Sequence, residues 1–474
     1  MRWRTPLALL GIPCALLGCR TAAAPEPAAV SPEQKVFLAS DADLPPGFHA
    51  ELTDAPVFGG QVFILEGGRP GGPVVVLVHG LGESGSRDFY SVLPALAEGY
   101  HVISFDLPGF GRSTHGTELY SPERYAEFIR ALVRQRHSGR FNLVGHSMGG
   151  AISLTYAARF PGDLDRLFLI DAAGFLHRKA YVNFAVSAGL DHVLGIFAGP
   201  GKDLLDTTIQ AAAVAVGPLP ATPEPDFLLN NALLRGAILG TPTRIAALAT
   251  MLQNFAPLIA GVKTPTWILW GRNDGIASLR TAKILQAKLP TARLRVLESS
   301  GHDPMSSAPV DVSQFLLDGL ATAPATVAQR IQPAAKAMQP GTCEGKSGMR
   351  FQGDYTEIDI ASCSDVRLEG VRSGSIRIRD SVVTVENTEV TSDGVALDVK
   401  NSKVEITASE FVGDVALQTN VGDLDLAGVT LRGRRKSVQV DRSSRLIFSI
   451  SRLESPVAHR FAHELLELGA GTDL

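Results

Sequence analysis

Hydrophobic positions between residues 48 and 297 form short runs that alternate with amphipathic stretches. Residues 74–78 (Val-Val-Val-Leu-Val) and 101–105 (His-Val-Ile-Ser-Phe) are almost wholly apolar, which is typical of strands buried on both faces. Residues 121–133 begin with Ser-Pro-Glu and then repeat apolar side chains at helical spacing, which predicts an amphipathic helix. Further strand-like runs lie at 49–53, 61–65, 141–144, 167–170, 266–270 and 294–297. About eight strands, with helices between the later ones, predict an α/β domain over residues 48–320 with a mostly parallel sheet.

One interval, about residues 174–262, contains no clear buried strand. It is rich in Ala, Leu and Phe, and its helical patterns are broken at Gly-Pro and Pro-rich positions. An insertion of this length in an α/β domain is usually a helical cap or lid. Its phenylalanines either pack among themselves or line a pocket, and the pattern alone leaves both readings open.

From residue 343 onward the chain changes to short alternating segments that recur at about 20–22 residues. One series lies at 383–387, 404–408, 424–428 and 446–450, and a second at 375–378, 395–398, 415–418 and 437–440. Two strands in each repeat, separated by Gly, Asn, Ser and Asp, predict a small all-β domain over 343–474 that resembles a parallel β-helix of about four rungs. An antiparallel sandwich with even strand spacing is the alternative.

The segments that flank this repeat region carry their own expectations. Residues 321–342 are rich in Ala and Pro, which predicts a linker with a short helix at 326–338. Residues 457–468 show a helical pattern, and we expect that helix to cover an open end of the sheet.

Composition narrows the class of protein. A chain of 474 residues is too long for one ordinary domain, and its 45% hydrophobic and 19% charged content is that of a globular protein. The net charge of −4 gives no electrostatic reason to expect a nucleic-acid partner. After the N-terminus no apolar run reaches membrane-spanning length.

The N-terminus has the pattern of a targeting segment. Arg2 and Arg4 precede a short apolar core at residues 7–17, which is too short to span a membrane. The following Leu-Leu-Gly-Cys at 16–19 resembles a bacterial lipobox, which implies a signal peptide of residues 1–18 and a lipid on Cys19. Residues 19–47 would then be a tether to a membrane in the cell envelope. The alternative is an ordinary secreted protein with a chance cysteine.

The four cysteines fit that compartment. Cys14 would leave with the signal peptide and Cys19 would carry the lipid, so Cys343 and Cys363 remain. An oxidising envelope favours a disulfide between them, closing a loop of about twenty residues worth roughly 3 kcal/mol in the chain-entropy model. Two free buried thiols are the alternative. The Cys and His residues show no metal-site spacing, and we expect neither a metal nor a cofactor.

A candidate nucleophile sits at residues 145–150, Gly-His-Ser-Met-Gly-Gly. An apolar strand precedes this stretch and a helical pattern follows it, so strand, sharp turn and helix meet at Ser147. A Gly-x-Ser-x-Gly turn of this kind lifts the serine Oγ off the strand end into a cleft. A serine is a weak nucleophile by itself, so it needs a base, a group that orients the base, and donors for an oxyanion.

The later strands supply candidates for each of these roles. Asp274 follows the strand at 266–270 and His302 follows the strand at 294–297, at the edge where open α/β sheets place their sites. The glycine-flanked turn at 79–82 follows another strand, and the N–H groups of Leu81 and Met148 are the expected oxyanion donors.

These motifs together resemble the α/β-hydrolase superfamily of serine hydrolases. The residues that carry the resemblance are 79–82, 106–113, 145–150, 169–171, 270–274 and 301–304. The resemblance implies an α/β-hydrolase sheet with a helical cap and a triad in the order Ser147, Asp274, His302. Some relatives place the acid after the preceding strand, which makes Asp171 the second candidate. His146 is expected to pack the turn, and His79 to order the oxyanion loop.

The expected activity is hydrolysis of a small apolar acyl ester through an acyl-enzyme. The same motifs also serve C–C bond hydrolases and cofactor-free peroxidases, which remain alternatives on this fold. A non-enzymatic surface-binding protein is the third reading, because the repeat domain offers a possible glycan or protein partner a binding face.

Overall fold

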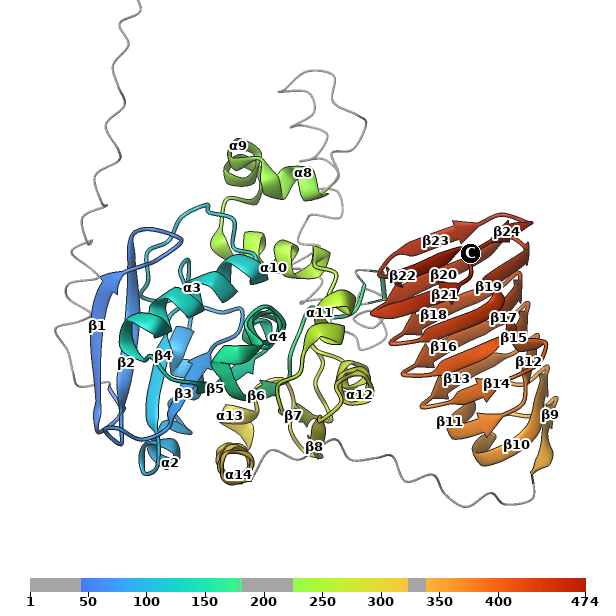
Figure 1. Ribbon diagram of the computed structural model, residues 1–474, viewed down its shortest axis with the longest axis horizontal. Helices are drawn as coiled ribbons and strands as arrows, with labels where there is room; N and C mark the ends of the chain where they lie inside the picture. Colours follow the sequence, from blue (N-terminus) through green and yellow to red (C-terminus); the bar gives the residue numbers. More distant parts are fainter. Residues whose placement is uncertain (1–43, 178, 181–224, 323–337) are drawn as a thin grey trace, which may run out of the picture.

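The structure is a computed structural model that describes residues 44–177, 179–180, 225–322 and 338–474 (Figure 1). It contains an α/β unit followed by a large all-β repeat domain. The expected signal peptide, Cys19, most of the tether, the central part of the cap and almost all of the helix at 326–338 lie outside the described residues. Within the described part of the chain, no helix combines the length and apolar character needed to cross a membrane.

The α/β unit is built on an eight-stranded sheet of order β1-β2-β4-β3-β5-β6-β7-β8. Its first two pairings are antiparallel and the others are parallel, as the sequence predicts. The strands are β1 (Phe48–Asp54), β2 (Gln61–Gly68), β3 (Val74–Val78), β4 (His101–Phe105), β5 (Phe141–His146), β6 (Leu164–Ile170), β7 (Thr266–Gly271) and β8 (Arg293–Leu297).

Helices cover both faces of this sheet, which explains why its central strands are apolar throughout (Figure 1). In β3, Val74 and Val76 join the core beneath α3 and α4, whereas Val75 and Leu77 join the core beneath α2 and α14. The helices are η2 (Gly85–Phe89), α2 (Leu93–Ala97), α3 (Pro122–Arg136), α4 (Met148–Arg159), η3 (Pro161–Asp163), α12 (Leu279–Lys288), α13 (Pro304–Ser307) and α14 (Pro309–Ala321).

The interval between β6 and β7 begins with a loop at residues 171–177, and its described part from residue 225 onward is largely helical. It comprises α8 (Pro225–Asn230), α9 (Ala232–Leu234), η4 (Arg235–Leu239), α10 (Pro242–Leu252) and α11 (Ala256–Gly261). Buried Arg235 ties this region to the α/β unit, because its Nε donates to the carbonyl of Thr117 at 2.7 Å. These helices lie over the edge of the sheet where β5 ends (Figure 1).

The repeat domain is larger than the sequence suggested and begins earlier, at Gln339. Its strands pair in parallel with partners about one repeat away along the chain, so the antiparallel sandwich is wrong. The strands are β9 (Gln339–Glu344), β10 (Arg350–Ala361), β11 (Val366–Ser373), β12 (Ile376–Arg379), β13 (Val382–Glu386), β14 (Glu389–Thr391), β15 (Val395–Lys400), β16 (Lys403–Thr407), β17 (Glu410–Asn420), β18 (Asp423–Ala427), β19 (Thr430–Arg442), β20 (Ser444–Ser449), β21 (Ser451–Ser455), β22 (Ala458–Ala462), β23 (Leu465–Leu468) and β24 (Thr472–Asp473).

The helix expected at 457–468 is wrong, because β22 and β23 occupy this segment. They pair antiparallel with β21 and β20, and so cover the last coil with strands. Side-chain exposure along β22 alternates with a period of two residues, as in a strand. The mixture of apolar and polar residues in this segment also fits a helical period, which explains the wrong prediction.

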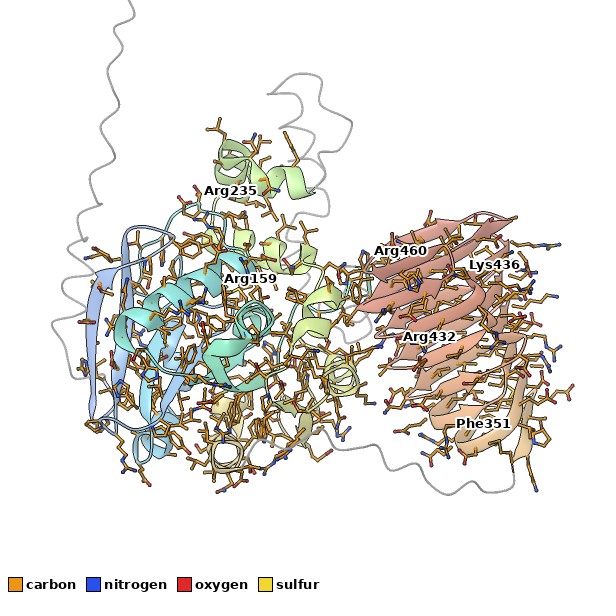
Figure 2. All side chains as sticks on the ribbon, in the orientation of Figure 1. Arg159, Arg235, Phe351, Arg432, Lys436 and Arg460 are labelled. Carbon is orange, nitrogen blue, oxygen red and sulfur yellow. A yellow bond between two sulfur atoms is a disulfide. The ribbon has the colours of Figure 1, made fainter. Side chains whose placement is uncertain are left out.

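The two ends of the coil stack differ in their surroundings. Arg460 lies at the end near the α/β unit, where β22 contacts α11, and Phe351 lies at the opposite end (Figure 2). The predicted disulfide between Cys343 and Cys363 is present at that distant end, joining β9 to the turn after β10. It closes the first coil of the described part of the repeat domain.

Candidate active site

Ser147 occupies a sharp turn between β5 and α4. Its backbone has a φ of 53° and a ψ of −120°, a conformation that a residue with a side chain rarely adopts. Three backbone hydrogen bonds hold it there: its N–H donates to Ile170, and its carbonyl accepts from Gly150 and Ala173. The turn therefore fixes the serine at the carboxyl end of the central strands.

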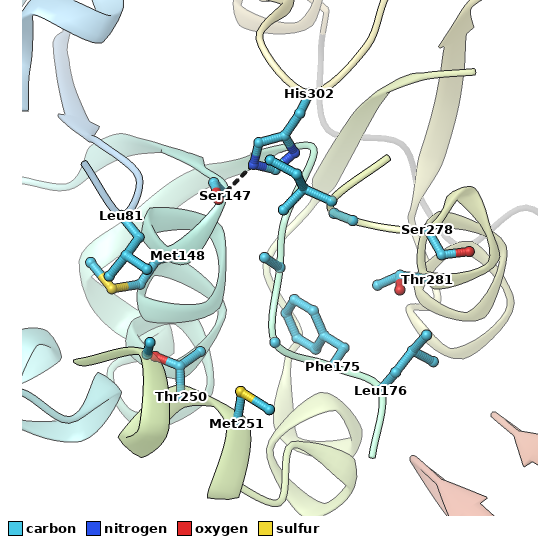
Figure 3. Close-up of a pocket in the computed structure, with 15 residues that line it drawn as sticks. Leu81, Ser147, Met148, Phe175, Leu176, Thr250, Met251, Ser278, Thr281 and His302 are labelled. Carbon is cyan, nitrogen blue, oxygen red and sulfur yellow. Dashed lines mark hydrogen bonds between the residues drawn. The ribbon is translucent and has the colours of Figure 1, made fainter. Parts of the chain in front are cut away.

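His302 and Asp274 complete a hydrogen-bonded row with this serine. His302 Nε2 lies 2.9 Å from Ser147 Oγ (Figure 3). His302 Nδ1 lies 2.9 Å from Asp274 Oδ2. The Asp274 side chain is fully buried, whereas His302 is partly open to solvent. Because the carboxylate accepts from Nδ1–H, the neutral imidazole presents Nε2 as an acceptor for the serine hydroxyl proton.

The second oxygen of Asp274 is held by the backbone. Oδ1 accepts from the N–H groups of Ile276 and Ala277 at 2.7 and 2.8 Å. These residues lie immediately before α12, so the carboxylate orientation depends on where that helix starts. Gly271 keeps the acid loop against the base loop, since a Cβ there would lie 2.2 Å from the Gly301 carbonyl.

Asp171, the second candidate acid, does not contact His302. Its Oδ1 accepts from Gly271 N–H at 2.8 Å, and its Oδ2 has no hydrogen-bond partner among the residues that the structure describes. Burial, and next the negative charge of Asp274, raise the pKa of Asp171 to about 8. A carboxyl group in this state is protonated at neutral pH, so it is poorly suited to stabilise a cationic imidazole.

The turn at residues 79–82 packs directly against the nucleophile. A Cβ on Gly80 would lie 2.9 Å from the Cβ of Ser147, so glycine is required for this close approach. His79 orders the turn, because its Nδ1 donates to the Gly80 carbonyl and its Nε2 accepts from Leu107 N–H. Burial lowers the pKa of His79, in agreement with the neutral ring that this pattern requires.

Leu81 and Met148, the expected oxyanion residues, both line the cavity at Ser147 (Figure 3). Met148 is the first residue of α4, where backbone N–H groups lack intrahelical partners. The structure thus places both residues beside the serine, in positions consistent with a pair of backbone donors.

His146 has a role that the sequence did not reveal. Its Nε2 donates to the main-chain carbonyl of His302 at 2.8 Å, and its Nδ1 lies 3.7 Å from Asp88 Oδ2. Burial alone would lower the pKa of His146, but the Asp88 carboxylate outweighs burial and raises it. His146 does more than pack the turn, because it holds the loop that carries His302.

Asp106 organises the loops on the far side of the oxyanion turn. It accepts hydrogen bonds from Ser86 and from the backbone and guanidinium of Arg112, all between 2.7 and 3.0 Å. Burial would raise the pKa of Asp106, but the Arg112 hydrogen bond and charge overcome it and leave that pKa below its usual range. This buried pair fixes structure and does not reach the serine.

An apolar cavity of about 170 Å³ opens beside Ser147 and His302 (Figure 3). Its walls come from six separate parts of the chain: the turn at 79–82, the start of α4, residues 173–176, α10, residues 276–281 and His302. The side chains that close it include Leu81, Met148, Phe175, Leu176, Met251 and Ile276. Phe175 packs against the buried cap residue Phe255, with 4.6 Å between the ring centroids. Phe175 also lines the cavity, so the cap phenylalanines do both of the things that the sequence left open.

Known proteins that are similar to this chain include an uncharacterized protein, a lipase and a phospholipase. An uncharacterized protein of Mycobacterium tuberculosis is 29% identical over 262 residues, covering 52% of this chain and 76% of that protein. Lipase 1 of Psychrobacter immobilis is 29% identical over 305 residues, covering 62% of this chain and 89% of the lipase. A solved structure of a membrane phospholipase A, described as a bacterial virulence factor, matches with 24% identity and a TM-score of 0.45, covering 61% of this chain and 93% of that one.

A family model makes the assignment. The model for the alpha/beta hydrolase fold matches residues 73–309, which is half of the chain and contains every residue of the site described above. The resemblance inferred from six motifs is thereby confirmed, and the non-enzymatic reading gives way to that of a hydrolase. This chain belongs to the α/β-hydrolase fold family.

Proposed function

We propose that this hydrolase cleaves carboxylic esters of an apolar acyl group, with Ser147 as nucleophile, His302 as base and Asp274 as the acid that orients the base. The observation that carries the proposal is the hydrogen-bonded row of these three side chains at the mouth of an apolar cavity. The similarity to a lipase supports the same reaction class.

The geometry of the three side chains supports the following acylation step. Ser147 Oγ attacks the ester carbonyl carbon while its proton passes to His302 Nε2. The imidazolium that forms is stabilised by Asp274, and the oxyanion is bound by the N–H groups of Leu81 and Met148. When the tetrahedral species collapses, the C–O bond to the alcohol breaks and His302 returns its proton to the departing oxygen.

Deacylation repeats these steps with water. His302 Nε2 removes a proton from a water molecule, whose oxygen attacks the acyl carbonyl of the Ser147 ester. Collapse of the second tetrahedral species releases the carboxylic acid and restores the serine hydroxyl. Each turnover therefore consumes one ester and one water and leaves the enzyme unchanged.

The cavity indicates the size of the acyl group. Its apolar walls favour hydrocarbon, and a 150 Å³ apolar cavity in another protein accepts benzene. A volume of about 170 Å³ therefore suits a chain of roughly six carbons. We expect butyrate and hexanoate esters to be turned over faster than acetate or palmitate esters.

A fluorophosphonate probe and a series of p-nitrophenyl esters test this function. The wild type should be labelled at Ser147 and should hydrolyse the esters. Ser147→Ala should abolish labelling and lower kcat about a thousandfold or more, with an unchanged Tm. Ser313→Ala is the matched control, because its Oγ bonds only its own helix at Pro309. Folded wild-type protein that is neither labelled nor active would contradict the proposal.

We also propose that the enzyme is tethered to a membrane of the cell envelope through a lipid on Cys19. The support is the basic, apolar and Leu-Leu-Gly-Cys order of the first nineteen residues. In a bacterial host, the wild type should enter the membrane fraction and incorporate labelled fatty acid. Cys19→Ser should do neither, while Cys14→Ser should behave as the wild type; equal partition of Cys19→Ser and wild type would contradict the anchor.

A further inference from the structure

We propose that the repeat domain helps to determine acyl specificity. It holds two walls of the acyl pocket in place and so sets which acyl groups fit. This inference rests on the proposed ester hydrolysis. The two walls are residues 174–177 and residues 276–281, where α12 starts, and both contact the repeat domain directly.

Arg280 makes the first connection. Its side chain is only 10% exposed and reaches from α12 into the repeat domain. Nε donates to Thr407 Oγ1 at 2.7 Å, and Nη2 donates to the carbonyls of Ile406 and Asp425 at 2.8 and 3.0 Å. Nη1 lies 3.0 Å from the Asp425 carboxylate. One guanidinium thus fastens the first turn of α12 to two successive coils.

That first turn belongs to the active site. Ser278 and Thr281, on either side of Arg280 in the sequence, line the cavity (Figure 3). The two residues before Ser278 donate the N–H groups that hold Asp274 Oδ1. A shift of this turn would therefore move a pocket wall and loosen the acid at the same time.

The second connection comes from the opposite wall. His177 N–H donates to Ser449 Oγ at 2.9 Å, and the His177 and His463 rings lie 5.5 Å apart. Phe175 and Leu176, the residues just before His177, line the cavity. The repeat domain therefore holds the pocket at two points that are about a hundred residues apart in the sequence.

The face that makes these contacts is built for α12. On successive coils Glu405 pairs with Asp425, and Asp425 pairs with Ile447. Ala427 and Ser449 lie two residues further along the same strands as Asp425 and Ile447, and they pair with each other. The contacts change along this face from charged to apolar. Lys283 pairs with Glu386 at one end, and Ala427, Ile447 and Ile450 join the hydrophobic core of the α/β unit at the other.

The charges are complementary across this interface. The helix α12 brings Arg280 and Lys283, and the repeat face brings Glu386, Glu405 and Asp425. Since Arg280 is nearly buried, its loss would leave the partly buried Asp425 carboxylate without its cation. We therefore expect the contact to be a fixed junction whose geometry reaches the pocket.

Arg280 is thus a positioning residue, and its test must separate position from stability. The test compares kcat and KM for acetate, hexanoate and decanoate p-nitrophenyl esters in Arg280→Ala and Ser449→Ala, the latter located in the repeat domain. We expect the hexanoate-to-acetate ratio of kcat/KM to fall about tenfold in Arg280→Ala and less in Ser449→Ala. Arg280→Lys keeps the positive charge but loses the planar guanidinium that makes several hydrogen bonds at once. Its hexanoate-to-acetate ratio should lie between those of the wild type and Arg280→Ala.

Lys288→Ala is the matched control. Lys288 contacts the same domain, at Thr430, but from the far end of α12. It should keep the wild-type acyl preference even if its Tm falls. A uniform loss with all three esters in Arg280→Ala, or an identical change in Lys288→Ala, would overturn the inference and reduce the junction to a stabilising contact.

Hydrogen exchange supplies a readout that does not need turnover. In Arg280→Ala, amides at 174–177 and 274–281 should exchange faster, while α3 and α14 should keep their protection. Unchanged exchange at both walls would overturn the inference. An inactive, unlabelled wild type would instead overturn the proposed ester hydrolysis, so the two failures are distinguishable.

Discussion

His146 Nε2 donates a 2.8 Å hydrogen bond to the main-chain carbonyl of His302, so the residue before Ser147 supports the loop that carries His302. This bond joins the end of β5 to the loop after β8. It acts in addition to the side-chain bond between Ser147 and His302. The distance between nucleophile and base is therefore set twice, once by side chains and once through the backbone.

Removing this support should slow catalysis. In His146→Ala the His302 loop loses its bond to the elbow, and we expect kcat to fall about tenfold or more with a smaller change in KM. Ester kinetics at saturating substrate will measure it. His137→Ala is the control, because its half-buried ring bonds the Arg140 carbonyl of its own loop. A wild-type kcat in His146→Ala would show that the backbone bond is dispensable.

Asp171 and Asp274 should separate cleanly on substitution. Asp274→Asn should lower kcat by about 10³- to 10⁴-fold, because an amide cannot stabilise the imidazolium or set its tautomer. Asp171→Asn should keep most of the activity, because its amide oxygen can still accept from Gly271 N–H. Greater loss in Asp171→Asn than in Asp274→Asn would exchange the two roles.

Asp171 should also give the fold a pH dependence. Its pKa is raised to about 8 by burial and by Asp274, from 3.8 for an ordinary Asp, so the folded state holds a proton that the unfolded chain releases. The resulting stability is fully present below about pH 4 and is lost as pH rises toward 8. Melting curves across this range should show Asp171→Asn gaining on the wild type with increasing pH, by an amount on the order of a few kcal/mol. A constant difference would contradict the raised pKa.

Gly149 is a position where a single methyl group should damage the site. A Cβ there would lie 2.1 Å from the Val78 carbonyl and 2.5 Å from the His79 carbonyl, and neither backbone atom can move without shifting the oxyanion turn. Gly149→Ala should cost about 1–3 kcal/mol of stability and lower kcat. Gly162→Ala, which meets no atom within 4 Å, is the control. Wild-type stability and kcat in Gly149→Ala would show that the elbow tolerates the shift.

The disulfide should matter mainly to the repeat domain. Cys343 and Cys363 are separated by twenty residues, and replacing both with serine should lower the free energy of unfolding by about 3 kcal/mol. Calorimetry of the double variant, and of wild type with reductant, should show the same lower Tm. Ester turnover below that temperature should be unchanged, since the bond lies at the end of the stack far from the α/β unit.

The α/β unit, and the positions of Ser147, Asp274 and His302 at the ends of its strands, were predictable from sequence because each depends on local signals. Ser147 is marked by glycines that a strand–turn–helix junction needs, and Asp274 and His302 follow apolar strands directly. From sequence, Asp274 could be preferred to Asp171 as the acid only because of its motif. The physical reason is that burial and the nearby Asp274 carboxylate raise the pKa of Asp171, and this depends on the folded protein.

Contacts between distant segments escaped the sequence analysis. The bond from His146 to His302 spans more than a hundred residues and involves a backbone atom, which leaves no side-chain pattern. The acidic row that receives Arg280 escaped as well, because it emerges only when coils stack in register. The segment at 457–468 failed for a different reason: pairing with the last coil, rather than its own periodicity, makes it a strand pair.

Because the domain is repetitive, α12 could dock on it in more than one register. Successive coils offer nearly the same backbone surface, so a helix could in principle settle one coil too early or too late. One coil later, Ile447 would take the place of Asp425 and Asp425 the place of Glu405, so Arg280 would face one carboxylate instead of two. One coil earlier, Ala408 would take the place of Gly428, where a Cβ would lie 2.7 Å from Ile284 and crowd it. Differences in side chains between otherwise similar coils thus fix the register in which α12 docks. Coils could be added beyond β9 without changing that register.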